Sequence, residues 1–349
     1  MLKIIQQFLK SESTNPKDLK ELDPKCNYWE EWEIILVDCN YFGMDDIAGS
    51  YILKSIEGEE TKCALIDNTN GRSVPIILNA LKKYSIKPEN VEYIIVTHIH
   101  LDHSSGTSGL LKHCSNATVL VHPRGARHMV DPTRLMESAA KVYGGIDNVQ
   151  KLYGPVTKIS EEKVRSVSDG EIIEFGGRKL QFIHTLGHAK HHVCIHDLHT
   201  NSLFSGDNFG IRLPALHKQK HDHEIVWPTS TPIGFDPEEA IKTVVKLQKL
   251  QPDRIFLAHY GPIFQIDLVA NRLVKALNCY WDMCKQAKEE QIKPKELLQY
   301  VHKKMNSWFN EFIRSVVENE EQEQIVMELM KADIELNSQG LVFYILHFM

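Results

Sequence analysis

Apolar and polar residues alternate along the first two thirds of the chain in short runs that predict β-strands. Runs of β-branched and other apolar residues bounded by Gly, Pro, Asn or Asp are typical of strands buried in a sheet. The strands predicted in this way are 33–42, 50–56, 62–68, 91–97, 117–121, 171–175, 178–185, 192–197, 202–204 and 254–258. The strands form two sets, one over residues 33–121 and one over residues 171–258. Each of these two parts of the chain also contains segments of helical pattern.

Helical segments are predicted where apolar residues recur three or four positions apart. A helix is expected over 74–84, a short one over 107–112, and a helical stretch over 124–154 with breaks at Pro132, Gly144 and Gly145. Asp236 followed by Pro237 and two acids is typical of a helix start, so a further helix is expected to run to about residue 251. Strands followed by helices and strands, twice over, predict an α/β fold of two packed sheets with helices outside.

The two ends of the chain differ from this middle part. Residues 264–349 are rich in Glu, Lys, Gln and Leu and lose the strand pattern, and helices are expected over 271–291, 294–309 and 323–340. The first 32 residues are polar and mixed, and they predict a short helix or arm followed by an irregular link whose aromatic residues pack. The predicted organisation is an N-terminal arm over 1–32, a catalytic domain over 33–263 and a helical C-terminal extension over 264–349.

Composition limits the kind of partner that the protein can have. The chain of 349 residues is 42% hydrophobic and 25% charged, which is the balance of an ordinary globular protein. A net charge of −6 argues against nucleic acid or an anionic membrane surface as the main partner. No apolar run is long enough to span a bilayer. Seven widely spaced cysteines predict reduced thiols, and we expect a cytoplasmic protein.

The stretch Tyr93–Gly106, which reads YIIVTHIHLDHSSG, joins a predicted buried strand to a cluster of metal-binding side chains. His98 and His100 lie two positions apart on an extended segment, where alternate side chains point the same way and can converge on one ion. Asp102 and His103 follow where the chain bends and can face a second ion. Zinc and similar divalent metals bind imidazole nitrogen and carboxylate oxygen. An ordinary loop has no reason to gather three imidazoles that repel when protonated, so the stretch predicts a metal site.

Three later strand ends carry the same kind of side chain. His188 follows the 178–185 strand, Asp207 follows the 202–204 strand, and His259 follows the 254–258 strand. A single His or Asp at a strand end is usually solvated or forms a turn. Because four strand ends present such residues before turns, we predict that they meet around metal. In chain order, the predicted ligands are His98, His100, Asp102, His103, His188, Asp207 and His259.

This ordered set resembles the metallo-β-lactamase superfamily over about residues 33–262. The resemblance implies a four-layer αβ/βα sandwich with the site at one sheet edge, here with an appended C-terminal helical region. It assigns the ligands to two divalent metal ions: His98, His100 and His188 to the first, Asp102, His103 and His259 to the second, and Asp207 to both as a bridge. Zinc is expected, with iron or manganese as alternatives, since the same donors serve all three. Asp67 matches the structural aspartate of the family.

The presence of a bridging Asp together with a second-site His is similar to the hydroxyacylglutathione hydrolase and phosphodiesterase branches. The resemblance therefore implies a binuclear hydrolase in which a metal-bridging hydroxide attacks an ester, thioester, lactone or phosphodiester. Asp102 and Asp207 would then serve catalysis as ligands. His192 is a candidate that either supports a ligand or contacts an oxyanion, with a purely structural role as an equal alternative. Tyr260 is a candidate donor to the substrate, and the segment 217–223 is either a solvated loop or a lid.

Two other functions are compatible with the sequence. The first is an iron-dependent, oxygen-handling enzyme of the persulfide dioxygenase or diiron type on the same scaffold, although flavodiiron members carry Glu where this chain has His100. The second is a non-catalytic binding protein that uses the helical extension. The expected partner is a small-molecule substrate, and the extension is a candidate homodimer contact.

Overall fold

The computed structural model of the protein describes residues 23–57, 60–212, 224–317 and 319–349. Within these ranges it contains a seven-stranded sheet with the order β1-β2-β3-β4-β5-β6-β7. Its strands are β1 (Cys26–Trp29), β2 (Ile34–Asp38), β3 (Gly49–Glu57), β4 (Glu60–Ile66), β5 (Val91–Ile95), β6 (Thr118–Val121) and β7 (Val164–Ser166). The first four strands pair antiparallel, whereas β4 to β7 pair parallel.

A second sheet has six strands in the order β13-β12-β11-β10-β9-β8. Its strands are β8 (Ile172–Phe175), β9 (Arg178–Thr185), β10 (His192–Asp197), β11 (Ser202–Phe204), β12 (Arg254–Leu257) and β13 (Gly261–Ile263). β11 and β12 are parallel and the other neighbours are antiparallel. As a result β9, β11 and β12 all run in one direction and end at the same edge of the sheet.

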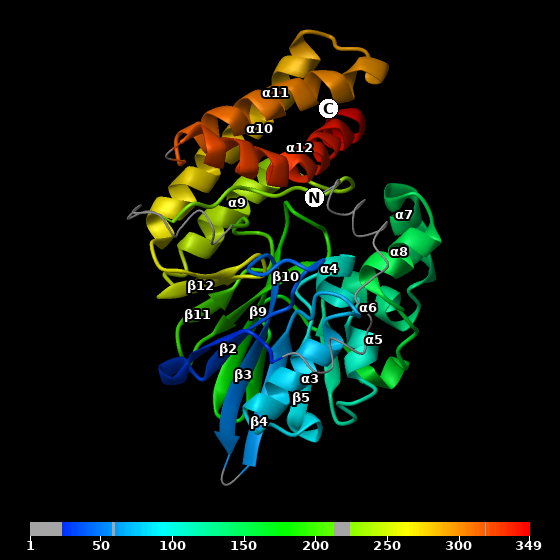
Figure 1. Ribbon diagram of the computed structural model, residues 1–349, viewed down its shortest axis with the longest axis vertical. Coiled ribbons are helices and arrows are strands. Elements are labelled where there is room, and N and C mark those ends of the chain that lie inside the picture. The colour runs from blue at the N-terminus through cyan, green and yellow to red at the C-terminus, as the bar shows by residue number, and fades with distance from the viewer. Residues whose placement is uncertain (1–22, 58–59, 213–223, 318) are drawn as a thin grey trace.

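The helices lie outside the two sheets. They are α3 (Val74–Lys83), α4 (Leu101–Ser104), α5 (Thr107–Leu110), α6 (Pro123–Val130), α7 (Thr133–Tyr143), α8 (Ile146–Tyr153), α9 (Pro237–Gln248), α10 (Ile266–Glu289), α11 (Pro294–Arg314) and α12 (Glu320–Phe348). Short 3-10 helices occupy Glu30–Trp32, Pro88–Asn90 and Glu161–Lys163. Figure 1 shows α10, α11 and α12 together at one end of the molecule, beyond the sheet edge at which α4 lies.

Strand β2 shows why the sequence forms layers. Its residues are all buried, although their side chains point alternately to two faces. Ile34 and Leu36 pack between the sheets in a cluster with side chains of the second sheet, whereas Ile35 and Val37 pack under α3. A strand covered on both faces reads as a continuous apolar run. The predicted four-layer αβ/βα sandwich is confirmed.

The outer face of the second sheet carries the C-terminal helices. Ile255 and Leu257 of β12, Val244 of α9, Leu273 of α10 and Leu341 of α12 belong to one continuous buried cluster. The helical region therefore shares a hydrophobic core with the sheet that it covers. The predicted helices over 271–291, 294–309 and 323–340 are confirmed, each longer at one or both ends. The division of the chain into three domains stays a prediction.

Three strands were not expected from the sequence. β1 lies in the segment predicted to be an irregular link, and it pairs with β2 along its whole length. β7 has three residues that are exposed or half-buried, so it lacks an apolar run. β13 reads Gly-Pro-Ile, and Gly and Pro are poor strand formers. The part of the N-terminal arm before residue 23 lies outside the described residues.

Two further expectations concern cysteines and membranes. All seven cysteines are free thiols, as predicted. Among the described helices, none combines the length and the apolar character that crossing a membrane requires.

Candidate metal centre

Two neighbouring parallel strands of the first sheet deliver the first part of the site. β4 is followed by Asp67, and β5 is followed by an extended segment that carries His98 and His100. The chain then turns into α4, whose first turn holds Asp102 and His103. The carboxyl ends of parallel strands meet at one edge of a sheet, where α/β proteins commonly place their sites. The predicted bend after His100 is confirmed.

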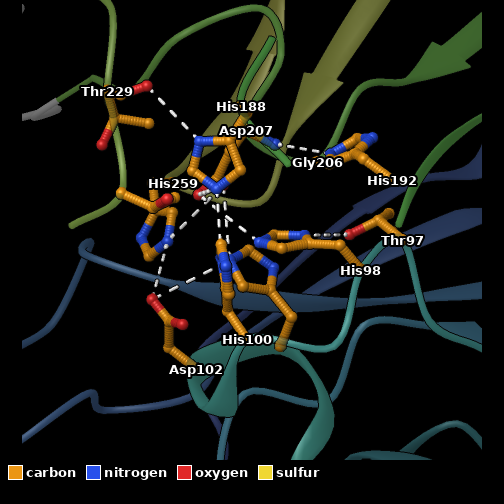
Figure 2. A network of polar contacts seen from close by, with 12 residues as sticks. Thr97, His98, His100, Asp102, His188, His192, Gly206, Asp207, Thr229 and His259 are labelled. Atoms are coloured by element: carbon orange, nitrogen blue, oxygen red, sulfur yellow. Dashed lines mark hydrogen bonds and ion pairs between the residues drawn. The ribbon is translucent and has the colours of Figure 1, made fainter. Parts of the chain in front are cut away.

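The second sheet delivers the remaining side chains at its facing edge. His188 follows β9, Asp207 follows β11 and His259 follows β12, and these three strands end on the same side. Figure 2 shows side chains from both sheets pointing toward one another. The structure thus brings together all seven residues that the sequence singled out, although they lie up to 161 positions apart, from residue 98 to residue 259.

The seven side chains form groups whose ligand atoms lie within 4.8 Å of one another. In the first group, His188 Nε2 lies 3.1 Å from His100 Nδ1, and His98 completes the group. In the second, Asp102 Oδ2 lies 3.6 Å from His259 Nε2 and 3.8 Å from His103 Nε2. The first group offers three imidazole nitrogens, and the second offers two imidazole nitrogens and one carboxylate. Both the number and the type of donors suit a divalent metal ion.

Asp207 lies between the two groups. Its Oδ2 is 3.3 Å from His188 Nε2 and 3.9 Å from His98 Nε2, on the side of the first group. Its Oδ1 is 3.4 Å from His103 Nε2 and 3.8 Å from His259 Nε2, on the side of the second. One carboxylate therefore presents one oxygen to each group, which is the arrangement that a bridging ligand requires.

Unpartnered polar atoms test whether the site fits metal. His98 Nε2, His103 Nε2 and Asp207 Oδ1 are buried, and none has a hydrogen-bond partner among the described residues. A buried polar atom without a partner is costly and calls for an explanation. All three atoms face the interior of the cluster, where a cation would satisfy them. The residues present therefore fit two divalent ions.

Comparison with known proteins supports the same conclusion. The model of the metallo-beta-lactamase superfamily matches residues 50–259, a segment that carries all seven side chains. The chain belongs to the metallo-beta-lactamase superfamily. The branch of the superfamily is not shown by this match, so the similarity to hydroxyacylglutathione hydrolases stays a prediction.

Two curated relatives align with part of this chain. A metallo-beta-lactamase fold-containing protein of Sulfurisphaera tokodaii is 29% identical over 189 residues, 53% of this chain and 66% of that protein. An acyl-coenzyme A thioesterase of Gallus gallus is 30% identical over 134 residues, 32% of this chain and 40% of that protein. The chain thus aligns with less than two thirds of the length of either relative.

Two solved structures share the fold of this chain. A crystal structure from Sulfolobus tokodaii superposes with a TM-score of 0.56 at 24% identity, covering 85% of this chain and 93% of that chain. A flavo di-iron protein variant from Thermotoga maritima superposes with a TM-score of 0.51 at 17% identity, covering 77% of this chain and 70% of that chain. At these identities the likeness concerns the fold alone.

The pKa values of the site's histidines and carboxyl groups are shifted by burial and by neighbouring charges. Burial lowers the pKa of His98 and His100, so both rings are neutral and keep a lone pair for metal. Burial also acts on His103, but the carboxylates of Asp207 and Asp102 outweigh it and raise the pKa of that ring. For the two carboxyl groups burial opposes ionisation, yet the neighbouring His103 outweighs it and lowers both pKa values. The carboxylates are therefore anionic at neutral pH.

Asp67 contacts His103 of the second group at the ring nitrogen that does not face the cluster. Its Oδ2 lies 2.9 Å from His103 Nδ1, and its Oδ1 accepts a hydrogen bond of 2.8 Å from the backbone N–H of Thr97. The backbone of Asp67 has φ = 51°, a left-handed conformation that Asp and Asn tolerate better than most residues. A carboxylate on the far nitrogen orients a histidine and fixes the proton there, which leaves the other nitrogen for metal. This agrees with the structural role that the resemblance implied for Asp67.

His192 lies behind the ligands and not among them. The ring is fully buried, with Nδ1 2.9 Å from Thr185 Oγ1, and Nε2 accepts a bond of 3.3 Å from the backbone N–H of Asp207. Gly206 makes this contact possible, because a Cβ atom there would lie 2.5 Å from His192 Nε2. His192 therefore supports the bridging residue, and of its predicted roles contact with an oxyanion is wrong for this arrangement because both ring nitrogens are engaged.

Tyr260 does not face the cluster. Its hydroxyl donates to Asp38 Oδ2 at 3.3 Å, and its ring packs in the core between the sheets with 4% exposure. The prediction that Tyr260 donates to a substrate is wrong in this structure, because the residue after His259 turns inward and not toward the site. Burial, reinforced by Asp38, raises the pKa of its hydroxyl well above the usual range.

Some residues of the site carried no clear signal in the sequence. His191 packs with its ring 5.3 Å from that of His100, and Asn208 Oδ1 accepts a bond of 3.4 Å from the backbone N–H of His188. His191 lies between His188 and His192, both of which the sequence analysis singled out, but it was itself given no role. The segment 217–223, predicted as a solvated loop or lid, lies outside the described residues.

Proposed function

We propose that the protein is a binuclear metal-dependent hydrolase of an ester, thioester, lactone or phosphodiester. The observation that carries the proposal is the position of Asp207, which turns one carboxylate oxygen to each of two three-residue groups. A site for one ion would have no use for a second group of donors with a shared carboxylate.

The residues of the chain divide the work of holding two ions. The first group would hold one ion, the second group the other, and Asp207 would keep them at a fixed separation. Two divalent cations, when bound, supply the Lewis acidity that polarises a carbonyl or phosphoryl oxygen and acidifies water. His192 fixes the backbone of Asp207, and Asp67 fixes the ring of His103. Because these supports are buried, the donors are in place before any substrate arrives, which is what electrostatic catalysis requires.

Among the four substrate classes, a thioester is the one that a relative supports. The Gallus gallus relative is an acyl-coenzyme A thioesterase, and 40% of its length aligns with this chain. We therefore place an acyl thioester first in the substrate panel, followed by lactones, esters and phosphodiesters.

The test is hydrolysis of that panel by protein reconstituted with zinc, iron or manganese. We expect activity on at least one class, with two metal equivalents per chain. In Asp207→Ala, activity should fall more than about 100-fold, since losing a mere hydrogen-bond partner of a ligand already costs 10- to 100-fold. Asp147→Ala, an exposed aspartate on α8, is the matched control and should change nothing. Unchanged activity and metal content in Asp207→Ala would contradict the proposal.

An iron enzyme that handles oxygen is the second candidate, because imidazole and carboxylate donors also suit iron. Elemental analysis of protein purified without added metal separates the two candidates. Iron together with oxygen consumption and no hydrolysis would favour the second candidate.

A further inference from the structure

The C-terminal helix α12 buries a polar residue against the loop 228–231, which connects toward α9. Asn337 is 1% exposed and lies on a helix face that also buries the apolar residues Ile334 and Leu341. A buried amide needs a hydrogen-bond partner. Asn337 Oδ1 accepts a bond of 2.7 Å from the backbone N–H of Ser230. The side chain thus reaches out of the helix and holds the loop.

Two further contacts join the helical region to the same loop. At Gly340 of α12, a Cβ atom would lie 2.5 Å from the carbonyl oxygen of Thr231, so only glycine permits the approach. On α10, the Tyr280 hydroxyl donates to the carbonyl oxygen of Pro228 at 3.4 Å. The loop is therefore fixed from two helices, at its first residue, its middle and its last residue.

The other side of this loop touches a metal ligand. The carbonyl oxygen of Thr229 lies 3.4 Å from His188 Nδ1. A dashed line marks this contact in Figure 2. That carbonyl and the N–H of Ser230 belong to one planar peptide group, and in a trans peptide they point in opposite directions. One peptide plane thus contacts Asn337 on one side and His188 on the other. Rotation of this plane would break both contacts together.

The contact decides which nitrogen of His188 can bind metal. A neutral imidazole carries one N–H, and an acceptor at Nδ1 keeps the hydrogen there. The lone pair is then on Nε2, the atom that lies 3.1 Å from His100 Nδ1 and 3.3 Å from Asp207 Oδ2 within the first group. A histidine ligand whose second nitrogen is held in this way binds metal more tightly.

We propose that Asn337 is a positioning residue for the metal ligand His188 and that it acts through the Thr229–Ser230 peptide. The helix α12 thereby helps to orient a ligand of the first group. The inference rests on the binuclear site of the proposed function. The inference gives the helical region a role in metal binding. It also explains why an amide is buried where packing alone would not require one.

The experiment compares metal affinities of variants by chelator competition. Asn337→Leu keeps the number and branching of the side-chain heavy atoms and removes the acceptor. It should weaken the affinity of the first group for its ion about 10-fold, while the affinity of the second group stays within about threefold. Asn337→Asp restores an acceptor and should recover most of that loss. Ser338→Ala is the matched control: Ser338 is fully buried on the same helix, but its hydroxyl donates to Ile334 of its own helix. It should leave both affinities unchanged.

A metal-free readout keeps the inference distinct from the proposed function. In protein labelled with ¹⁵N-histidine, and with the His188 signal assigned from a His188→Gln variant, we expect the Nδ1–H tautomer in the wild type. Asn337→Leu should show a mixture of tautomers, and Asn337→Ala serves the same purpose should the leucine fail to fold. An unchanged tautomer in a folded Asn337 variant, or equal weakening of both metal groups, would overturn the inference. If the wild-type protein hydrolyses nothing while Asn337→Leu still shows the mixture of tautomers, only the proposed function is refuted.

Discussion

Four histidines of the site use their second ring nitrogen in the same way. The Nδ1 atoms of His98, His103, His188 and His259 lie within 2.9–3.4 Å of an oxygen, respectively Thr97 Oγ1, Asp67 Oδ2 and the carbonyls of Thr229 and Ile47. Each ring is therefore held in one orientation with Nε2 turned toward the cluster. Among these partners, the Asp67 carboxylate is the only one that carries a charge, so we expect it to matter most.

Asp67→Asn tests this expectation at the scale of one residue. Asparagine tolerates the left-handed backbone at this position, so the change removes the charge with little backbone strain. Affinity of the second group for metal should fall by about 10- to 100-fold, because His103 loses its carboxylate partner, while the first group changes less. Metal content at graded chelator concentrations measures this. Equal affinity of the second group in wild type and variant would mean that Asp67 is structural only.

Residue types and spacing predicted the ligands, and Asp67 and His192 were singled out as supports, but the backbone groups that hold the ligands were not predicted. The series from His98 to His103 concentrates rare side chains at a strand end, and such a signal survives without any knowledge of the fold. Backbone carbonyls such as those of Thr229 and Ile47 exist at every position, so no pattern distinguishes the ones that hold a ligand. The direction of the Tyr260 side chain depends on how the chain turns after β12, and no local sequence pattern shows that turn.

At the scale of elements, strand ends and the tight turns after them place the site. Gly187, between β9 and His188, has φ = 108°, and a Cβ atom there would lie 2.3 Å from the Cα of Ala240 on α9. The turn therefore brings His188 close to a helix as well as to its partners. The helix α9 was predicted from its start signal and α10 from composition, whereas β7 and β13 form because neighbouring strands offer them hydrogen bonds.

Gly187→Ala should destabilise the protein by about 2–4 kcal/mol, because it adds a collision with backbone to left-handed strain. Gly177→Ala is the control, since Gly177 has φ = 82° but nothing within 4 Å of its Cβ position. The control should lose only about 1 kcal/mol, the cost of the strain itself. Chemical denaturation of both variants measures the difference, and similar losses would show that the approach to α9 is not tight.

At the scale of the whole molecule, the helical region and the second sheet share one core. The buried cluster runs from β12 through α9 and α10 to α12 without a break, and α12 also holds the loop beside His188. The sequence predicted these helices from composition and the loss of the strand pattern, but it could not show that they cover the sheet, because that depends on which apolar faces meet.

A chain that ends after Ile263 should therefore not form a stable protein. Removal of α10 to α12 would expose the apolar side chains of β12 and α9 that they cover, and exposed apolar surface of that extent drives aggregation. Thermal unfolding and light scattering of the shortened chain measure the effect. A soluble shortened chain with cooperative unfolding and unchanged metal content would contradict it. Light scattering of the full chain tests the predicted homodimer at the same time.

The most direct test of the account is anomalous diffraction from crystals of the metal-loaded protein, recorded at the absorption edge of the bound metal. The account predicts two peaks, one among His98, His100 and His188 and one among Asp102, His103 and His259, with Asp207 contacting both. A single peak, or two peaks with Asp207 bound to neither or to only one, would contradict it.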